Sequence, residues 1–176
     1  MVQPENVGGR RDLRTPTAAI FNAHVRDNLN FLYGAPACRV YNSANESILD
    51  STATALTFNS ERFDNDTMHS TSSNTERVTA TTAGRYLFIG NSAFAANATG
   101  TRLSQITHSV GPTDIAREWL PITGAASTTV LNVATIQAMA AAEYMTLQAW
   151  QTSGGALNVL SSANYSPEFM AHWMGN

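Results

Sequence analysis

From Ala37 to the end of the chain, short stretches of alternating apolar and polar residues recur between clusters of Gly, Ser, Asn and Pro. Successive side chains of a strand point to opposite faces, so this alternation predicts β-strands. Many short strands at this spacing are typical of an antiparallel sandwich, and a jelly roll fits best within that class. The predicted strands span residues 37–42, 54–58, 77–81, 84–95, 102–110, 128–139, 143–152 and 169–174.

Two of these segments leave an alternative open. Residues 138–150 are rich in Ala and Met and could be helical by propensity, but we favour a turn at 140–143 followed by a strand. In residues 128–139 both alternating faces carry apolar side chains, so this strand is expected to be buried on both sides.

The N-terminal part of the chain is predicted to be a helix, within the segment 15–36, preceded by an extended arm, residues 1–14. Thr15 suits the N-cap, Pro16 the first helical position, and Gly34 the end of the helix. One apolar stripe runs along this helix: Phe21, Val25, Leu29 and Leu32. So short a helix is marginal alone in water, so its stripe must dock on the body, a sister helix or another protein.

The composition favours self-association over binding to nucleic acid. Charged residues make up 13% of the chain, against about 25% in average domains. All ten basic residues are Arg, the formal net charge is −3, and no basic stripe is present, so nucleic acid is not an expected partner. No apolar run reaches the ~20 residues of a membrane span, and the N-terminus lacks the apolar core of a secretory signal. We therefore expect a protein made in the cytoplasm that does not enter membranes.

The residues that could carry chemistry are scattered. His24, His69, His108 and His172 show no metal-type spacing, and no serine-nucleophile motif is present. Asp64, Asp66 and His69 form the densest polar cluster. They could hold a hard cation, but capping of their own loop is the preferred interpretation. The single Cys38 is expected to be a buried thiol. We predict no enzyme activity, no cofactor and no metal.

Six aromatic residues fall at strand period and are predicted to pack in the core or at a trimer axis: Tyr86, Phe88, Phe94, Trp150, Phe169 and Trp173.

Residues 37–175 resemble the jelly roll of the complement globular heads and tumour-necrosis-factor proteins. Gly84, Tyr86 and Phe88 match that family's Gly-x-Tyr-x-Phe strand, and residues 169–174 match its aromatic-rich last strand. The Gly-Asp turn that the family carries before its penultimate strand is Ala142–Glu143 here, which keeps the acid and loses the glycine.

Several longer strings resemble a bacteriophage virion subset of this family. They are ALTFNSERFDND, MHSTSSNTERVT, FAANATGTR, WQTSGGALNV and YSPEF, together with the helical segment 21–34. The resemblance implies a homotrimeric jelly-roll domain, residues 37–176, in a virion structural protein made in the host bacterium.

Within that interpretation a capsid decoration (cement) protein is favoured, with the major capsid protein as partner. Arg10, Arg11 and Arg14 of the arm, together with the apolar stripe of the helix, are the candidate virion-anchoring residues. The alternative is a tail fibre or collar component, or a module that binds a host surface glycan through loops 64–76, 97–101 and 152–158.

Overall fold

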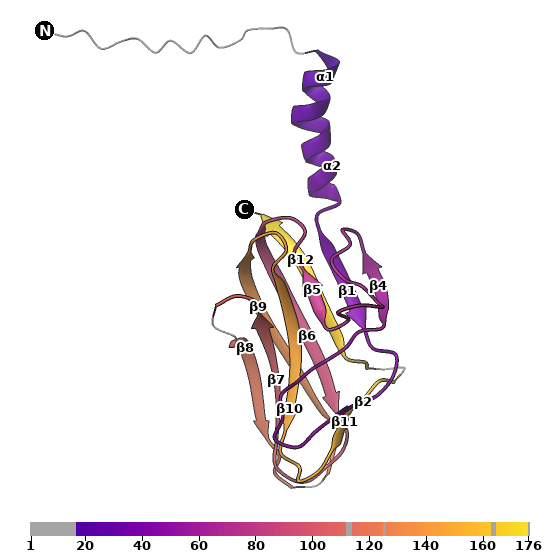
Figure 1. Ribbon diagram of the computed structural model, residues 1–176, viewed down its shortest axis with the longest axis vertical. Helices are drawn as coiled ribbons and strands as arrows, with labels where there is room; N and C mark the ends of the chain where they lie inside the picture. The colour runs from indigo at the N-terminus through magenta and orange to yellow at the C-terminus, as the bar shows by residue number, and fades with distance from the viewer. Residues whose placement is uncertain (1–16, 112–113, 125, 163–164, 176) are drawn as a thin grey trace, which may run out of the picture. The chain divides into compact units, whose positions relative to one another are not determined.

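The computed structural model describes residues 17–111, 114–124, 126–162 and 165–175, which form a helical unit and a β body (Figure 1). The helical unit ends at Gly34, and the body begins at Ala35. The arm with Arg10, Arg11 and Arg14, together with Thr15 and Pro16, lies outside the described residues.

The helix consists of α1 (Ala18–Phe21), a π-helical turn η1 (Asn22–Arg26) and α2 (Asp27–Tyr33). Its N-cap is Thr17, whose hydroxyl accepts a hydrogen bond from the Ile20 amide at 3.3 Å, so the start lies two residues beyond the predicted Thr15. At the other end the Gly34 amide donates to the Asn30 carbonyl, and the helix stops there as expected. Among the described residues, no helix is long and apolar enough to cross a membrane.

The body has two β-sheets, both antiparallel in every paired ladder. In the larger sheet the strands follow the order β2-β11-β6-β12-β1-β4, and β9 pairs with β6. This seven-stranded sheet consists of β1 (Ala37–Tyr41), β2 (Glu46–Ile48), β4 (Ser60–Asp64), β6 (Gly84–Phe94), β9 (Thr129–Met139), β11 (Leu157–Val159) and β12 (Glu168–Gly175).

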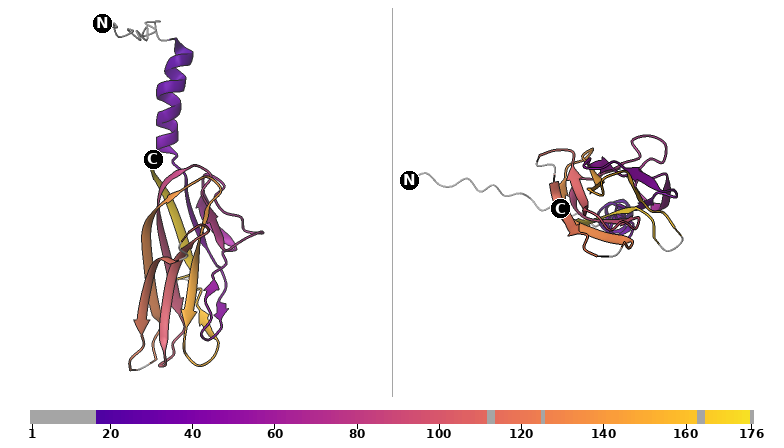
Figure 2. Two further views of the ribbon diagram at one scale, coloured as in Figure 1. Left: turned by 60° about the vertical axis from the view of Figure 1, so that its left-hand side comes forward. Right: turned by 90° about the horizontal axis from the view of Figure 1, so that it is seen from below.

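The smaller sheet has the order β3-β10-β7-β8, and β5 pairs with β10. It consists of β3 (Thr54–Ala55), β5 (Arg77–Thr79), β7 (Thr101–His108), β8 (Asp114–Pro121) and β10 (Tyr144–Gln151). Figure 2 shows the body from the side and along its strands. Strands far apart in sequence, such as β1 and β12, are neighbours, which is the arrangement of the predicted jelly-roll sandwich.

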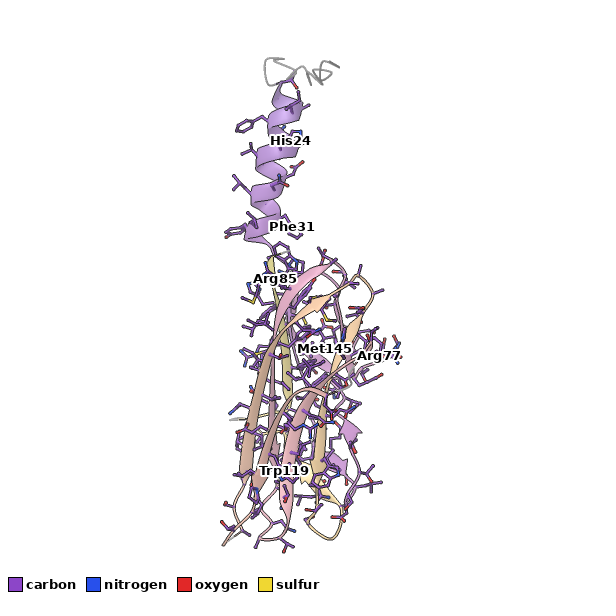
Figure 3. All side chains as sticks on the ribbon, turned by 90° about the vertical axis from the view of Figure 1, so that its left-hand side faces the viewer. His24, Phe31, Arg77, Arg85, Trp119 and Met145 are labelled. Atoms are coloured by element: carbon purple, nitrogen blue, oxygen red, sulfur yellow. The ribbon has the colours of Figure 1, made fainter. Side chains whose placement is uncertain are left out.

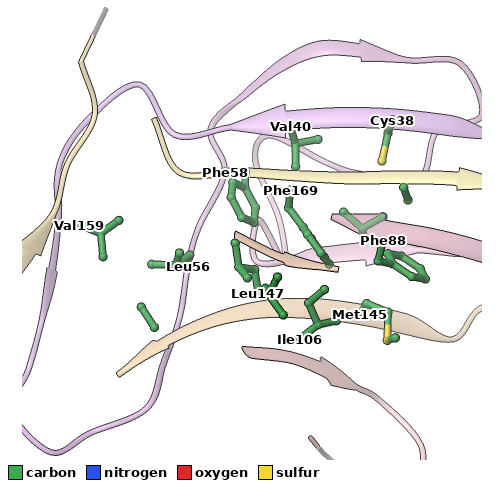
Figure 4. Close-up of a cluster of buried hydrophobic side chains, with 14 of the residues drawn as sticks. Cys38, Val40, Leu56, Phe58, Phe88, Ile106, Met145, Leu147, Val159 and Phe169 are labelled. Carbon is green, nitrogen blue, oxygen red and sulfur yellow. The ribbon is translucent and has the colours of Figure 1, made fainter. Parts of the chain in front are cut away.

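The core lies between the two sheets. Phe169 of β12 stacks on Phe88 of β6 at 5.8 Å and on Phe58 at 6.1 Å between ring centroids. Ile106, Met145 and Leu147 face them from the five-stranded sheet (Figure 4). Each of these side chains is fully buried, so the apolar residues of alternating strands close one continuous core.

The longest predicted strands are present, and the helical alternative for residues 138–150 is wrong. β9 ends at Met139, a turn follows in which Ala142 adopts φ 72°, and β10 begins at Tyr144. The segment predicted at 54–58 forms only the two-residue β3, although Leu56 and Phe58 are buried beyond it. Four strands were not predicted from the sequence: β2, β4, β8 and β11.

β9 also differs from its prediction as a strand buried on both sides. Leu131 and Val133 point into the core, whereas Val130 and Ile136 on the opposite face are 49% and 56% exposed. In a single chain the strand is therefore buried on one side only, and its second apolar face lies open.

Candidate functional site

The outward-facing side of the seven-stranded sheet, here called the outer face, presents three rows of side chains that the strand register places in line. The first row contains Ala37, His172, Leu87 and Ile136 on β1, β12, β6 and β9. The second contains Phe63, Arg39, Met170, Ile89 and Ala134, and the third contains Tyr41, Glu168, Asn91 and Asn132. Two mainly apolar rows, which include His172 and Arg39 respectively, thus lie beside one polar row, and Arg39 reaches across to the polar row.

The two apolar rows surround a shallow depression of about 290 Å³. Phe63, Leu87, Ile89, Met170 and His172 are among the residues that line it. Phe63 is 51% exposed although it is a large apolar residue. Exposed apolar side chains that adjoin one another mark interaction surfaces more often than isolated ones do.

The polar row is organised around one buried carboxylate, that of Glu168. Its Oε2 accepts hydrogen bonds from Arg39 Nε at 2.8 Å and Arg39 Nη2 at 2.5 Å. Its Oε1 accepts from Arg62 Nε at 3.0 Å and lies 2.9 Å from Arg62 Nη2. The Arg62 guanidinium also lies over the Tyr41 ring at 4.4 Å. Two arginines on one carboxylate leave a net positive charge of one on this part of the outer face.

The charge state of Glu168 follows from these contacts. Burial alone would raise the pKa of its carboxyl group, but hydrogen bonds and charge interactions with Arg39 and Arg62 outweigh burial and lower the pKa below its usual value. Glu168 is therefore a carboxylate at neutral pH, and the ion-paired cluster is intact there.

The polar loop after β4 is held by hydrogen bonds from its own side chains. Asp64 accepts hydrogen bonds from the amides of Asp66, Met68 and His69 at 2.9–3.1 Å. His69 Nδ1 lies 3.0 Å from Glu61 Oε1, and Nε2 lies 3.2 Å from the Thr75 carbonyl oxygen. Both ring nitrogens are thus engaged, and within the described ranges no group of three or more His, Cys, Asp or Glu is placed to hold a metal.

The six aromatic residues predicted for core or trimer packing separate into three groups. Tyr86, Phe88, Phe94 and Phe169 are fully buried in the core, and Trp173 packs against the core while half-buried. Burial raises the pKa of Tyr86 to about 12, with Asp66 adding to the effect, and its hydroxyl donates to the Thr82 carbonyl at 2.6 Å. Trp150 lies elsewhere: it points away from the core, on the solvent side of the five-stranded sheet.

The predicted anchoring stripe of the helix is open to solvent. Phe21, Leu29 and Leu32 are all more than half exposed, and Val25 is 37% exposed. The single Cys38 is buried on β1, where burial and, secondarily, the nearby Asp64 raise the pKa of its thiol above the usual value.

Sequence reasoning missed most of the outer face. Phe63, Ile136 and Met170 were not predicted as site residues because their significance depends on which strands lie side by side. The available signal was the second apolar face of residues 128–139, which a two-sheet sandwich covers on one side only.

Comparison with known proteins identifies the fold. No protein-family model matches the chain, and no curated protein matches it. Among solved structures, the globular domain of zebrafish complement 1qA is 14% identical, with a TM-score of 0.54, and the match covers 80% of this chain and 99% of that domain. The Eiger TNF of S. frugiperda is 9% identical, with a TM-score of 0.60, covering 80% of this chain and 95% of that one.

Murine APRIL gives a similar result, at 11% identity and a TM-score of 0.60, with 79% of this chain and 98% of that one covered. At these identities the likeness concerns the fold alone. The body of this chain has the jelly-roll fold of complement 1q and tumour-necrosis-factor domains.

Proposed function

We propose that this chain is a non-enzymatic structural protein that assembles as a homotrimer through the outer face of the seven-stranded sheet. The observation that supports this most strongly is the pair of adjacent apolar rows on that face, with Phe63 and Ile136 each about half exposed. Burying those rows against a second copy removes apolar surface from water, at about 25 cal/mol per Å². The chain's low charge fraction supports the same proposal, since such a surface suits contact with copies of itself.

The charge on the outer face favours a ring over a two-fold dimer. In a two-fold interface the same patch forms both sides, so two Arg39–Glu168–Arg62 clusters, each with an excess positive charge, would lie within one interface. In a three-fold ring the face of one copy meets a different surface of the next. The cluster then avoids its own charge, and the ring closes with every outer face covered.

We further propose that the trimer is a virion component of a bacteriophage, favoured as a capsid decoration protein. This rests on the strings in residues 55–66, 68–79, 94–102, 150–159 and 165–169 that resemble phage proteins. It also rests on the exposed stripe of the helix, because Phe21, Leu29 and Leu32 present a surface suited to anchoring in a larger assembly.

The trimer interface is tested by placing a charge on the outer face. Ile136→Arg puts a guanidinium at the β9 end of an apolar row, beside Leu87, so we expect the trimer to dissociate to monomers that keep their β-sheet circular dichroism. Val110→Arg is the matched control, because Val110 is 55% exposed but lies in the loop after β7, away from the outer face. An Ile136→Arg variant that keeps the mass of the unmodified assembly contradicts this interface.

The virion location is tested by counting copies. Quantitative mass spectrometry of purified virions should find hundreds of copies of a decoration protein, and their loss should lower the heat resistance of the capsid. A count of only a few copies assigns the protein to the tail instead. Absence from virions contradicts the phage proposal and leaves the trimer proposal untouched.

A further inference from the structure

A second, separate surface stands out on the solvent side of the five-stranded sheet. The register places Trp150 of β10, Leu103 of β7 and Trp119 of β8 in one row. The two indole rings meet edge to face, with centroids 6.4 Å apart and an interplanar angle of 71°. Trp119 is 60% exposed, and Figure 3 labels it on the body. Most of this indole is therefore open to solvent although it contacts Trp150.

The next row across the same strands carries polar side chains that end in planar amide or guanidinium groups. It contains Gln148, Gln105 and Arg117. Gln105 Nε2 donates to Gln148 Oε1 at 2.8 Å, which leaves the Gln105 oxygen to accept and the Gln148 amide to donate. Arg117 forms an ion pair with Asp114, so the groove carries no excess charge. The two tryptophans line a depression of about 230 Å³ together with Ala53, Leu103, Gln105 and Arg117.

This combination matches the chemistry of a sugar ring. A pyranose has one face of C–H groups, which packs on an indole, and a rim of hydroxyls, each of which both donates and accepts hydrogen bonds. Side-chain amides and a guanidinium supply those bonds in a fixed plane. The depression is smaller than the ~300–1,000 Å³ pockets that hold drug-sized ligands, and its volume suits a single ring.

A protein partner fits this surface less well. The apolar area is one row wide, because Gln105 and Gln148 adjoin it and the Thr107–Thr146 hydroxyl pair, 2.6 Å apart, lies beyond them. A stable protein interface covers roughly 800 Å² of each partner around an apolar centre. On this surface the apolar centre is only as large as one sugar ring.

We propose that the Trp119–Trp150 groove binds a neutral pyranoside unit of a glycan. The indoles stack on the ring, and Gln105, Gln148 and Arg117 bind its hydroxyls. The groove belongs to the five-stranded sheet and the outer face to the other sheet, so the proposal rests on residues other than those of the outer face. It also differs from the loops 64–76, 97–101 and 152–158 that the sequence suggested for glycan contact.

The test uses the full chain carrying Trp173→Phe, so that fluorescence reports on Trp119 and Trp150. The probes are methyl glycosides of glucose, galactose, mannose and N-acetylglucosamine, each titrated through the millimolar range, followed by an array of bacterial surface polysaccharides. We expect a saturable fluorescence change with at least one probe and a binding signal on the array. We expect Trp119→Ala to weaken that binding about tenfold or more, since truncating a central indole removes most of the stacking contact.

Two further variants separate binding from folding. Trp119→Tyr keeps an aromatic ring that can stack on the sugar and should retain part of the affinity. Gln105→Leu leaves both indoles in place and should weaken binding by removing polar contacts. Val110→Arg should bind like the unmodified chain. The proposal is overturned if no probe or array glycan binds, or if binding persists unchanged in Trp119→Ala. It is also overturned if Trp119→Ala blocks attachment to virions while no sugar binds, because the groove is then a protein contact.

Discussion

At the scale of single residues, Arg102 is the largest fully buried side chain in the described part of the body. Its guanidinium donates from Nη1 to the carbonyls of Thr99 and Thr101 at 2.9 and 3.1 Å, and from Nη2 to that of Asn97 at 3.2 Å. Burial lowers the pKa of this side chain, and none of the ion pairs among the described residues includes it. Arg102 therefore acts as a set of donors that fixes the loop 97–101.

Replacing Arg102 should cost stability through the carbonyls that it leaves behind. We expect Arg102→Met to lower the free energy of unfolding by about 2–4 kcal/mol, since buried acceptors lose their donors. Urea denaturation measures the change. Arg117→Met is the control, because it removes an exposed ion pair worth about 0–1 kcal/mol. An equal, small loss in both variants contradicts this role for Arg102.

The Glu168 cluster makes stability depend on pH. The lowered pKa of the folded carboxyl means that its stabilising contribution is present above the usual glutamate pKa, about 4.3, and is lost as the pH falls through the lower folded value. We expect the melting temperature to fall more steeply with acidification in the unmodified chain than in Glu168→Gln. If the melting temperatures of the two proteins fall in parallel as the pH is lowered, the cluster contributes nothing to this pH dependence.

Residue roles were predictable from the sequence only where local pattern decides them. Tyr86, Phe88 and Phe169 lie in core strands whose inward face alternation defines. Trp150 follows the same alternation, but its phase places it outward, opposite Ala149 and Leu147 in the core. Periodicity separates two faces without saying which one is buried, so the sequence left Trp150 as a residue of either the core or a trimer contact, and the structure places it outside the core.

At the scale of elements, β6 and β10 come from different sheets and approach closely at Gly90. A Cβ atom added to Gly90 would lie 2.4 Å from Leu147 Cδ1, well inside van der Waals contact. Leu147 is itself fully buried, so it has little space into which to move. The absence of a side chain at this position of β6 sets the local distance between the layers.

A double-mutant cycle tests this contact. Gly90→Ala should lower the free energy of unfolding by about 1–3 kcal/mol through overpacking, and Leu147→Ala by about 2–5 kcal/mol through a cavity. In the double variant the new methyl group occupies part of that cavity, so its cost should be less than the sum of the two. Simple additivity would show that the layers do not meet at this point.

The elements themselves were predictable in proportion to their length. β6, β9, β10 and β12 each alternate over eight or more residues, and the sequence located all four. β2 and β11 have three residues each, too few for a period to show. β8 lies at the edge of its sheet with exposed residues along most of its length, so no buried face marked it. Its register against β7 is nonetheless what brings Trp119 beside Leu103.

At the scale of the whole molecule, the two sheets present different outward surfaces. The outer face of the seven-stranded sheet joins two apolar rows to a cluster of excess positive charge, which suits contact with other copies in a ring. The five-stranded sheet presents a single aromatic row bordered by amides, which suits a small ligand. Sequence alone predicted the fold of this body, but which surfaces are apolar emerged only from the order of the strands.

The central claim, that copies of this chain associate through the outer face, is tested most directly by the molar mass of the purified full-length protein in sedimentation equilibrium. One chain has a mass of 18.9 kDa, so a homotrimer has three times that mass, about 57 kDa. The account predicts the trimer mass over a wide range of concentrations. A single 18.9 kDa species at all concentrations would contradict it.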